Sequence, residues 1–265
     1  QNKGLELGLD ANLLERNFRW NINANISFNR NKVIKLYGGE DILTGSVNVV
    51  ALQDNSSILR EGRPIGQFYG YKEDGYDENG KIVYQDLEPD GVLTNADKTY
   101  IGNYNPNFVY GLNSNMSFMN FDLNIFFQGT YGNDIFNLSS ITYAYDYVSG
   151  LNMIRDVLYN SWTPENPNAK YPIISRNTTA NFSNRFIEDG SYLRLKNIQL
   201  AYNFTGAFQN LSMFKNLQIY VSGQNLLTLT KYSGWDPEVN SSGIGIDNKT
   251  YPMSKSFTLG LRARF

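Results

Sequence analysis

The sequence alternates apolar and polar residues in several separate stretches, and this alternation constrains the fold more than any other feature. From Phe18 to Phe28, the even-numbered residues are apolar and the odd-numbered residues are polar, most of them Asn. Successive side chains of a β-strand point to opposite faces, so the pattern predicts a strand with one apolar and one polar face. Asn forms strands poorly on a dry face, because its amide needs hydrogen-bond partners. The polar face is therefore expected to meet water.

The same period of two occurs in seven stretches of the chain. They are residues 5–13, 18–28, 108–118, 121–127, 193–204, 217–221 and 256–265. In the fifth stretch the apolar positions are odd at Leu193 and Leu195 but even from Ile198 onwards. One extra residue in the strand would restore the register, so we expect a β-bulge near Lys196 and Asn197.

The connections between these stretches alternate between short and long. The short ones are residues 15–17, 119–120 and 205–215, and the long ones are residues 33–105, 132–190 and 229–253. Within the long ones we expect short strands at 66–71 and 81–84 and a helix at 151–162. Outer-membrane barrels have short periplasmic turns and long extracellular loops, and a tilted strand of about 9–11 residues crosses the bilayer. The pattern therefore favours a transmembrane β-barrel whose long loops are extracellular.

The composition excludes several other classes. The chain has neither Cys nor His, so it lacks disulfides, thiolate metal sites and the commonest general base. Its net charge of −2 gives no basic surface for nucleic acid. No run of about 18 apolar residues is present for a membrane helix. We expect no enzymatic activity and no nucleic-acid partner.

Seven strands do not close a bacterial barrel, which has an even number of strands. We therefore predict an all-β fold that forms the C-terminal portion of a large antiparallel transmembrane β-barrel, with lipid and lipopolysaccharide around it. The remaining strands would come from preceding sequence or another chain, and the fragment alone would be unstable. The last stretch ends on Phe265, which we expect to support assembly into the outer membrane. The alternative fold is a soluble β-sandwich.

A candidate metal loop runs from residue 86 to residue 97. Acidic side chains at positions 1, 3, 5 and 12 and a carbonyl at position 7 match the ligand spacing of an EF-hand loop. The predicted ligands are Asp86, Glu88, Asp90, the carbonyl of Val92, and Asp97. Oxygen ligands at this spacing suit a structural Ca²⁺, with Mg²⁺ as a second possibility. The alternative is an acidic surface turn without metal.

Two further groups of loop residues were considered as sites. The carboxylate pairs Glu188–Asp189 and Asp236/Glu238 could perform acid–base chemistry, but solvated turns or contacts that order the loops explain them better. The loop aromatics could stack on sugars, pack against a partner, or order the loops themselves. They include Tyr143, Tyr145, Tyr147, Trp162 and Trp235. The sequence does not decide between these roles, and the substrate-binding residues stay unknown.

Four motifs in order carry a family resemblance. They are REGRPIGQFYGYK (60–72), DGVLTNADK (90–98), IEDGSYLRLKNIQLAY (187–202) and GQNLLTLTKYSGWDPEV (223–239). The sequence resembles the C-terminal part of SusC/RagA-family proteins, which are TonB-linked outer-membrane transporters of Bacteroidetes. The resemblance extends over nearly the whole chain.

The resemblance implies a 22-stranded barrel closed by a plug, with a SusD-type surface lipoprotein over its outer mouth. It also implies TonB-dependent import of glycans or peptides. The signal peptide, TonB box, plug and first part of the barrel have no counterpart in the 265 residues, so the energy-coupling parts would lie outside this chain. The alternative function is a self-contained structural or adhesive β-domain that binds ligands through its loops without transport.

Overall fold

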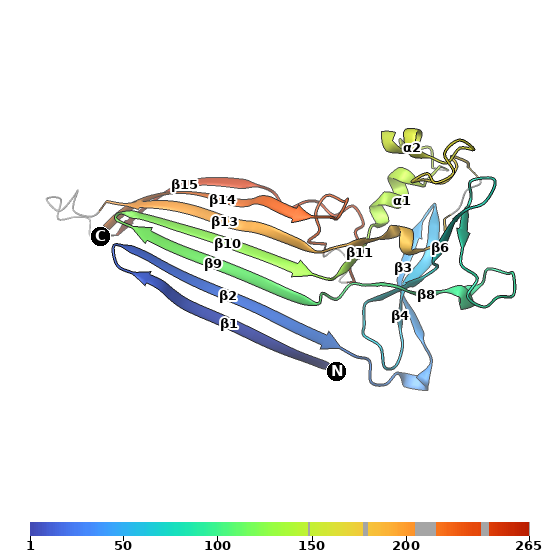
Figure 1. Cartoon of the computed structure of the whole chain (residues 1–265), viewed down its shortest axis with the longest axis horizontal. Helices are drawn as coiled ribbons and strands as arrows, with labels where there is room; N and C mark the ends of the chain where they lie inside the picture. Colours follow the sequence, from blue (N-terminus) through green and yellow to red (C-terminus); the bar gives the residue numbers. More distant parts are fainter. Residues whose placement is uncertain (148, 177–179, 205–215, 240–243, 265) are drawn as a thin grey trace.

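Seven long antiparallel strands form one sheet, and the connections at one end of it fold into a separate compact region (Figure 1). The computed structural model describes residues 1–147, 149–176, 180–204, 216–239 and 244–264. The strand order is β1-β2-β9-β10-β13-β14-β15. The strands are β1 (Asn2–Glu15), β2 (Phe18–Asn31), β9 (Phe108–Phe118), β10 (Phe121–Tyr131), β13 (Tyr192–Asn203), β14 (Asn216–Thr230) and β15 (Ser256–Arg264). The seven predicted strands are confirmed.

The strand registers place most apolar residues of the seven strands on one face, which we call the apolar face, whereas Phe126 and Tyr220 lie on the other. Leu7 lies opposite Ile26, Leu123 opposite Met116, and Val221 opposite Leu259. The intervening residues form the polar face. Many apolar side chains are exposed in this chain, Leu259 by 76% and Phe257 by 77%. Exposed apolar surface of this extent is typical of a face that meets lipid.

Aromatic residues mark both ends of the apolar face. At the end with the short turns, ring pairs form between Phe18 and Phe118 and between Phe121 and Tyr202. At the loop end, Phe108 contacts Phe28 and Tyr131. The roughly 10 steps from Phe18 to Phe28 extend about 33 Å along the strand, at about 3.3 Å per residue. A tilt of about 40° reduces this to about 25 Å, the height of the apolar band that aromatic girdles flank in membrane barrels.

A row of side-chain amides crosses the polar face over five strands. Asn197 donates to Asn124 at 3.1 Å, Asn124 to Asn115 at 2.7 Å, Asn115 to Asn21 at 3.4 Å, and Asn21 to Asn12 at 3.0 Å. Each amide from Asn197 to Asn21 therefore donates to the amide on the neighbouring strand that is closer to β1. Hydrogen bonds linked in such a chain polarise and strengthen one another. The Asn side chains that were expected to meet water thus also form hydrogen bonds with one another across the strands. We call these five residues the amide row.

A second polar row lies nearer the short turns. Ser117 and Asn203 both donate to the carboxylate of Asp122, each at 2.6 Å. Gln218 donates to Asn203 at 2.9 Å, and Arg262 donates to Gln218 at 3.2 Å. Together the two rows connect all seven strands through their polar side chains, in addition to the backbone ladder.

Register shifts occur in the sheet at Leu13, at Lys196 and, in β14, between Gln224 and Leu227. Phe126 pairs with Asn197 and Phe127 with Leu195, so Lys196 is the extra residue, as predicted from the change of parity. A second bulge was not predicted. In β1, Asn12 pairs with Asn21 of β2 and Leu14 pairs with Trp20, so Leu13 is the extra residue. Leu14 and not Leu13 therefore lies on the apolar face. The sequence hides this bulge because both candidates are leucine.

The loop region contains short elements of its own. They are η1 (Tyr37–Gly39), β3 (Ile42–Val49), β4 (Leu52–Leu59), β5 (Gln67–Gly70), β6 (Glu73–Tyr76), β7 (Ile82–Tyr84), η2 (Asn95–Asp97), β8 (Thr99–Asn103), β11 (Asp134–Phe136), α1 (Leu138–Ala144), α2 (Arg155–Asn160), η3 (Asn184–Phe186) and β12 (Ile187–Asp189). The expected strands at 66–71 and 81–84 correspond to β5 and β7. Among the described residues, no helix is both long and apolar enough to cross a membrane.

The predicted helix at 151–162 is wrong in its extent, since α2 occupies only Arg155–Asn160. Its ends are held in extended conformations by other loop segments. The Ile154 amide donates to the carbonyl of Tyr143, and Trp162 donates to the carbonyl of Tyr171. Two sequence-based expectations, the short connection at 205–215 and the role of Phe265, lie outside the described residues.

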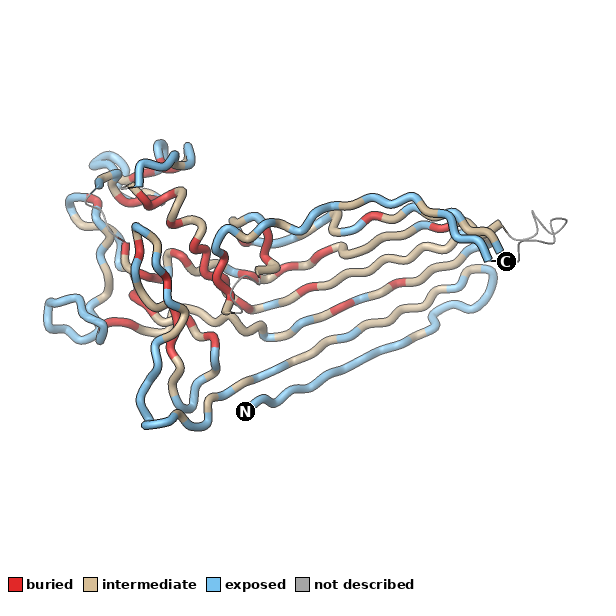
Figure 2. The backbone as a smooth tube through the Cα atoms, turned by 180° about the vertical axis from the view of Figure 1, so that it is seen from behind, coloured by how far each residue is buried: buried red, intermediate tan, exposed pale blue. Residues whose placement is uncertain are grey.

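The main hydrophobic core lies in the loop region and not between the strands of the sheet (Figure 2). Phe68, Phe136, Phe182 and Phe186 are each 1% exposed or less, and Phe136 contacts Phe182 with ring centroids 4.6 Å apart. These residues come from β5, β11, the segment before η3, and η3. The first two long connections therefore share one core, which fixes them relative to each other.

Arginine at Ile22 and at Asn23 should have opposite effects on assembly of the intact barrel. Ile22 lies on the apolar face opposite Ser114, and Asn23 lies on the polar face opposite Asn113. Ile22→Arg should cost about 2–4 kcal/mol if the site lies near the bilayer midplane, whereas Asn23→Arg should be tolerated. Folding into vesicles, followed by gel mobility before and after heating, measures both. Equal damage from the two substitutions would contradict the assignment of the faces.

Candidate functional site

A buried arginine at the loop end of β13 joins the sheet to the third long connection. Arg194 is 2% exposed, and its guanidinium pairs with Asp236 at 2.5 Å and with Glu238 at 2.8 Å. It also donates to the hydroxyl of Thr228 at 3.0 Å. A guanidinium that bonds two carboxylates at these distances forms strong, oriented hydrogen bonds. We call Arg194, Asp236 and Glu238 the Arg194 cluster.

Asp236 also holds together two parts of its own connection. Its carboxylate accepts hydrogen bonds from the backbone amides of Glu238 and Met253, both at 2.9 Å. Burial alone would raise the pKa of this carboxyl. The two amides and the Arg194 guanidinium outweigh burial and hold the pKa below its usual range. Asp236 is therefore ionised at neutral pH and fixes residues 236–238 and 253 against β13.

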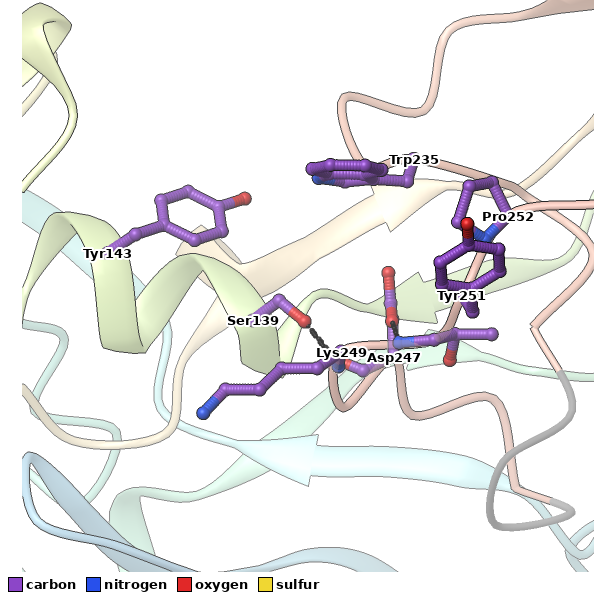
Figure 3. A pocket seen from close by; sticks show the side chains of 8 residues that line it. Ser139, Tyr143, Trp235, Asp247, Lys249, Tyr251 and Pro252 are labelled. Carbon is purple, nitrogen blue, oxygen red and sulfur yellow. Dashed lines mark hydrogen bonds between the residues drawn. The ribbon is translucent and has the colours of Figure 1, made fainter.

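The residue before Asp236 borders a cavity. Trp235 is 79% exposed although its neighbour Asp236 is buried. It lies over a cavity of about 280 Å³, with Tyr143 of α1 on one side and Tyr251 and Pro252 on the other (Figure 3). Because Asp236 is anchored, the position of the Trp235 ring depends on the Arg194 cluster.

Polar groups form the wall of this cavity that faces Trp235. The Asp247 carboxylate accepts hydrogen bonds from the hydroxyl of Tyr232 at 2.6 Å and from the amide of Thr250 at 3.0 Å. Ser139 of α1 donates to the carbonyl of Asp247 and accepts from the amide of Lys249. The cavity thus combines exposed aromatic rings with hydrogen-bonding groups on a pre-formed wall, as small-ligand sites do.

The aromatic residues singled out in the sequence divide into two groups. Tyr143 and Trp235 line the cavity, together with Tyr251, which the sequence analysis missed. Tyr145 packs on Phe186 at 5.1 Å inside the core. Tyr147 packs against the same core, and Trp162 lies against Gly80 so closely that a side chain there would overlap its ring. A run of aromatic residues alone gives no signal that separates these roles.

Solvated turns and loop-ordering contacts were both open for the two carboxylate pairs, and the pairs order the loops. Glu188 accepts hydrogen bonds from the side chain of Asn137 and from the amide and hydroxyl of Ser233, each at 2.8 Å. It therefore connects the second and third long connections. Asp189 accepts the amide of Ser191 at 2.9 Å. None of these contacts forms a pair of nucleophile and base.

The predicted calcium ligands occupy an exposed turn closed by Asp97. Asp97 is 1% exposed, and its carboxylate accepts the backbone amides of Leu87, Glu88 and Thr94 at 2.8, 3.1 and 2.7 Å. These amide donors, that of Thr94 first, hold the pKa of Asp97 below its usual range. The Asp97 carboxylate thus holds the two ends of the loop together by accepting backbone amides from both.

The other predicted ligands are directed differently. Asp86 accepts the amide of Gly91, and Asp90 accepts that of Val92, both at 2.8 Å. Asp86, Glu88, Asp90 and Val92 are all exposed. In the described ranges no three acidic side chains are grouped so that they could hold a metal ion. Calcium binding at this loop stays a prediction and would require the loop to rearrange.

Comparisons with known proteins place the whole chain in one group. It is 34% identical to a TonB-dependent receptor of Formosa agariphila and 28% identical to the TonB-dependent receptor SusC of Bacteroides thetaiotaomicron, with 100% of the chain covered in both. The solved structure of the RagAB peptide transporter superimposes on 99% of the chain with a TM-score of 0.82 and 25% identity. No protein-family model matches the chain.

The chain is thus similar over its whole length to proteins of the SusC/RagA family. It spans 29% of the length of the Formosa agariphila relative, 26% of SusC and 29% of the matched RagAB chain. The segment is therefore part of a large antiparallel β-barrel of the outer membrane. The amphipathic sheet agrees with this assignment in its strand lengths, its register and its two aromatic girdles.

Removal of the Arg194 side chain should release the third connection from β13. Arg194→Gln leaves the buried Asp236 carboxylate without its cation, which typically costs about 3–5 kcal/mol, and also unpairs the partly exposed Glu238. Hydrogen exchange in the intact barrel should then become faster at residues 231–239, and Trp235 fluorescence should change. Lys196→Gln is the matched control, because Lys196 contacts Glu238 at 3.3 Å while 25% exposed. Unchanged exchange in Arg194→Gln would show that other contacts hold this loop.

Substitution of Asp97 should loosen the 86–97 loop at neutral pH. The folded-state pKa of Asp97 is lowered, so its stabilising effect is present above the unfolded pKa and is lost as pH falls through the folded pKa. Asp97→Asn removes the charge, so the amides of Leu87, Glu88 and Thr94 should exchange faster. Asp90→Asn is the control, because Asp90 accepts from the Val92 amide alone in the hydrogen bonds found here. Equal exchange in both variants would contradict this role.

Calcium binding is tested on the same loop by titration of the intact protein. If the loop binds Ca²⁺, Asp86→Asn and Glu88→Gln should both abolish the heat of binding, and Glu78→Gln outside the loop should not. A wild-type protein that takes up no calcium at millimolar concentration would exclude the site.

Proposed function

We propose that this chain contributes to TonB-dependent import of glycans or peptides across the bacterial outer membrane. The observation that carries the proposal is its similarity, over its entire length, to TonB-dependent receptors and to the RagAB peptide transporter. The seven strands supply part of the barrel wall, with the apolar face toward lipid and the polar face toward the interior. The segments that contact TonB, and the plug, would lie outside these 265 residues.

The loop region would form part of the vestibule through which substrate enters. Its core and the Arg194 cluster hold it in one arrangement, so its surface is pre-formed for contact with a ligand or a partner. We propose that a SusD-type lipoprotein covers this end of the barrel. This proposal is supported by the similarity to SusC and to RagAB, and by the position of the loop region at one end of the sheet (Figure 1).

The cavity beside Trp235 is the surface of this chain best suited to touch the imported molecule. It offers an exposed ring and hydrogen-bonding groups that three loop segments hold in place: α1, residues 232–236 and residues 247–252. Aromatic rings of this kind contribute apolar contact and orient a ligand. Tyr251 is 87% exposed beside the same cavity. A molecule passing the loop end would meet both rings.

Substitution of both rings should reduce uptake without removing the transporter from the surface. In cells that carry the intact protein, Trp235→Ala with Tyr251→Ala should lower the rate of uptake of labelled oligosaccharides or peptides several-fold. Tyr159→Ala is the control, since Tyr159 is 70% exposed but does not line this cavity. Surface levels are followed in parallel by antibody labelling.

Two outcomes would contradict the proposal. If uptake persists in cells that lack TonB, the protein is not a TonB-dependent importer. If cells bind ligand at the surface and accumulate none of it, the alternative of an adhesive β-domain is correct. Normal uptake by the double variant in cells that require TonB would remove only the assignment of the cavity.

A further inference from the structure

Two cations face each other on the apolar side of the sheet at its loop end. Lys3 of β1 lies directly opposite Arg30 of β2. The next rung in the same face is Leu5 opposite Phe28, followed by Leu7 opposite Ile26. The cation pair is therefore one rung, about 7 Å along the strand, beyond the last apolar rung. We call Lys3 and Arg30 the cation pair.

The level of the cation pair matches the boundary between hydrocarbon and lipid headgroups. Phe28 belongs to the loop-end aromatic girdle, with its ring 5.7 Å from that of Phe108. Aromatic girdles mark the interfaces of membrane barrels. Residues one rung farther toward the loops are thus at headgroup level. Both members of the cation pair are exposed there.

No carboxylate neutralises the cation pair within the part of the chain that the structure describes. The ion pairs found there involve Arg60, Lys98, Lys170, Arg185, Arg194 and Lys196. The Arg30 guanidinium donates to the carbonyls of Pro106 and Asn107 and to the side chain of Asn107. These neutral acceptors fix its position but leave its charge. Like charges directly opposite each other destabilise a sheet unless an anion lies between them.

A third cation adds to this surface. Lys32 directly follows β2, has the same parity as Arg30 and is exposed. Of the acidic residues of the same two strands, Glu6 and Asp10 occupy the polar face, where they bond Ser27 and Asn21, and Glu15 lies at the opposite end, paired with Arg19. The loop end of the apolar face between β1 and β2 is therefore uniformly cationic.

We propose that Lys3, Arg30 and Lys32 bind the phosphate groups of a phosphorylated glycolipid in the outer leaflet of the membrane. A phosphate between Lys3 and Arg30 relieves their mutual repulsion and accepts charge-assisted hydrogen bonds from both. The acyl chains of the same lipid would then lie along the rungs of Leu5, Phe28 and Ile26. The site rests on the position of the sheet in the membrane and is independent of import.

The test compares lipids that differ only in phosphate. The intact transporter is placed in nanodiscs that contain bisphosphorylated lipid A, dephosphorylated lipid A or phosphatidylcholine, and retained lipid is counted by native mass spectrometry. Wild-type protein should retain the phosphorylated form preferentially. Lys3→Gln with Arg30→Gln should reduce that preference by about fivefold for each cation removed. This is the change in binding expected when one Lys or Arg is lost near an anionic lipid surface. Arg16→Gln with Arg264→Gln removes two charges at the opposite rim and should change nothing.

A second variant separates lipid binding from loop structure, because Arg30 also bonds the 106–107 segment. Lys3→Gln alone leaves those bonds intact and should still weaken retention, whereas Arg30→Lys keeps the charge and should retain phosphorylated lipid better than Arg30→Gln. Equal retention of phosphorylated and dephosphorylated lipid A by the wild type would overturn the proposal. So would undiminished preference in Lys3→Gln and in the double variant.

Discussion

The need to pair every backbone amide and carbonyl within hydrocarbon determines the rest of this structure. It requires long, uninterrupted strands, and such strands present alternate side chains to opposite faces. One face is then apolar and the other polar, so the sheet has no second layer against which to build a core. The buried aromatic residues lie instead in the connections, where Phe68, Phe136 and Phe182 pack together. The chain thus has a rigid wall and a separately packed loop region.

The two parts are joined by polar contacts. Arg194 lies on the polar face of β13 and neutralises two carboxylates of the third connection. Glu188 then bonds the second connection to the third. Burial makes these contacts depend on complete pairing, because a charge left alone in this environment is costly. The position of the loops is therefore set by a few specific pairs together with the shared core.

The sheet could be predicted from sequence because its signal is local. Period-two alternation identified all seven strands, and a change of parity located the bulge at Lys196. The bulge at Leu13 was missed because Leu13 and Leu14 give no change of polarity. The loop strands β3 and β4 pair with each other as a hairpin, but their sequences lack the clear alternation that would have predicted them. Similarly, Arg194 and Asp236 are 42 residues apart, and nothing in the sequence connects them.

The acidic loop shows how one pattern can fit two structures. Asp97 stands at the position of a calcium ligand, but it also follows Thr94 by three residues, the spacing of a capping box. In the structure the Thr94 side chain accepts the amide of Ala96, and Asp97 closes the turn. The capping signal was present in the sequence, and it explains Asp97 without a cation.

The amide row has a consequence for any solute that moves along the polar face. Its five members carry no net charge, and each amide is already bonded to a neighbour in the next strand. A neutral, internally satisfied surface exerts little long-range field and offers few strong bonds that a moving molecule would have to break. Anionic and cationic solutes would therefore interact with the amide row about equally strongly, and added salt would change these interactions little. Discrimination by charge would then depend on the charged groups elsewhere on this face, such as Asp122 and Arg262 nearer the short turns, and on the loop end.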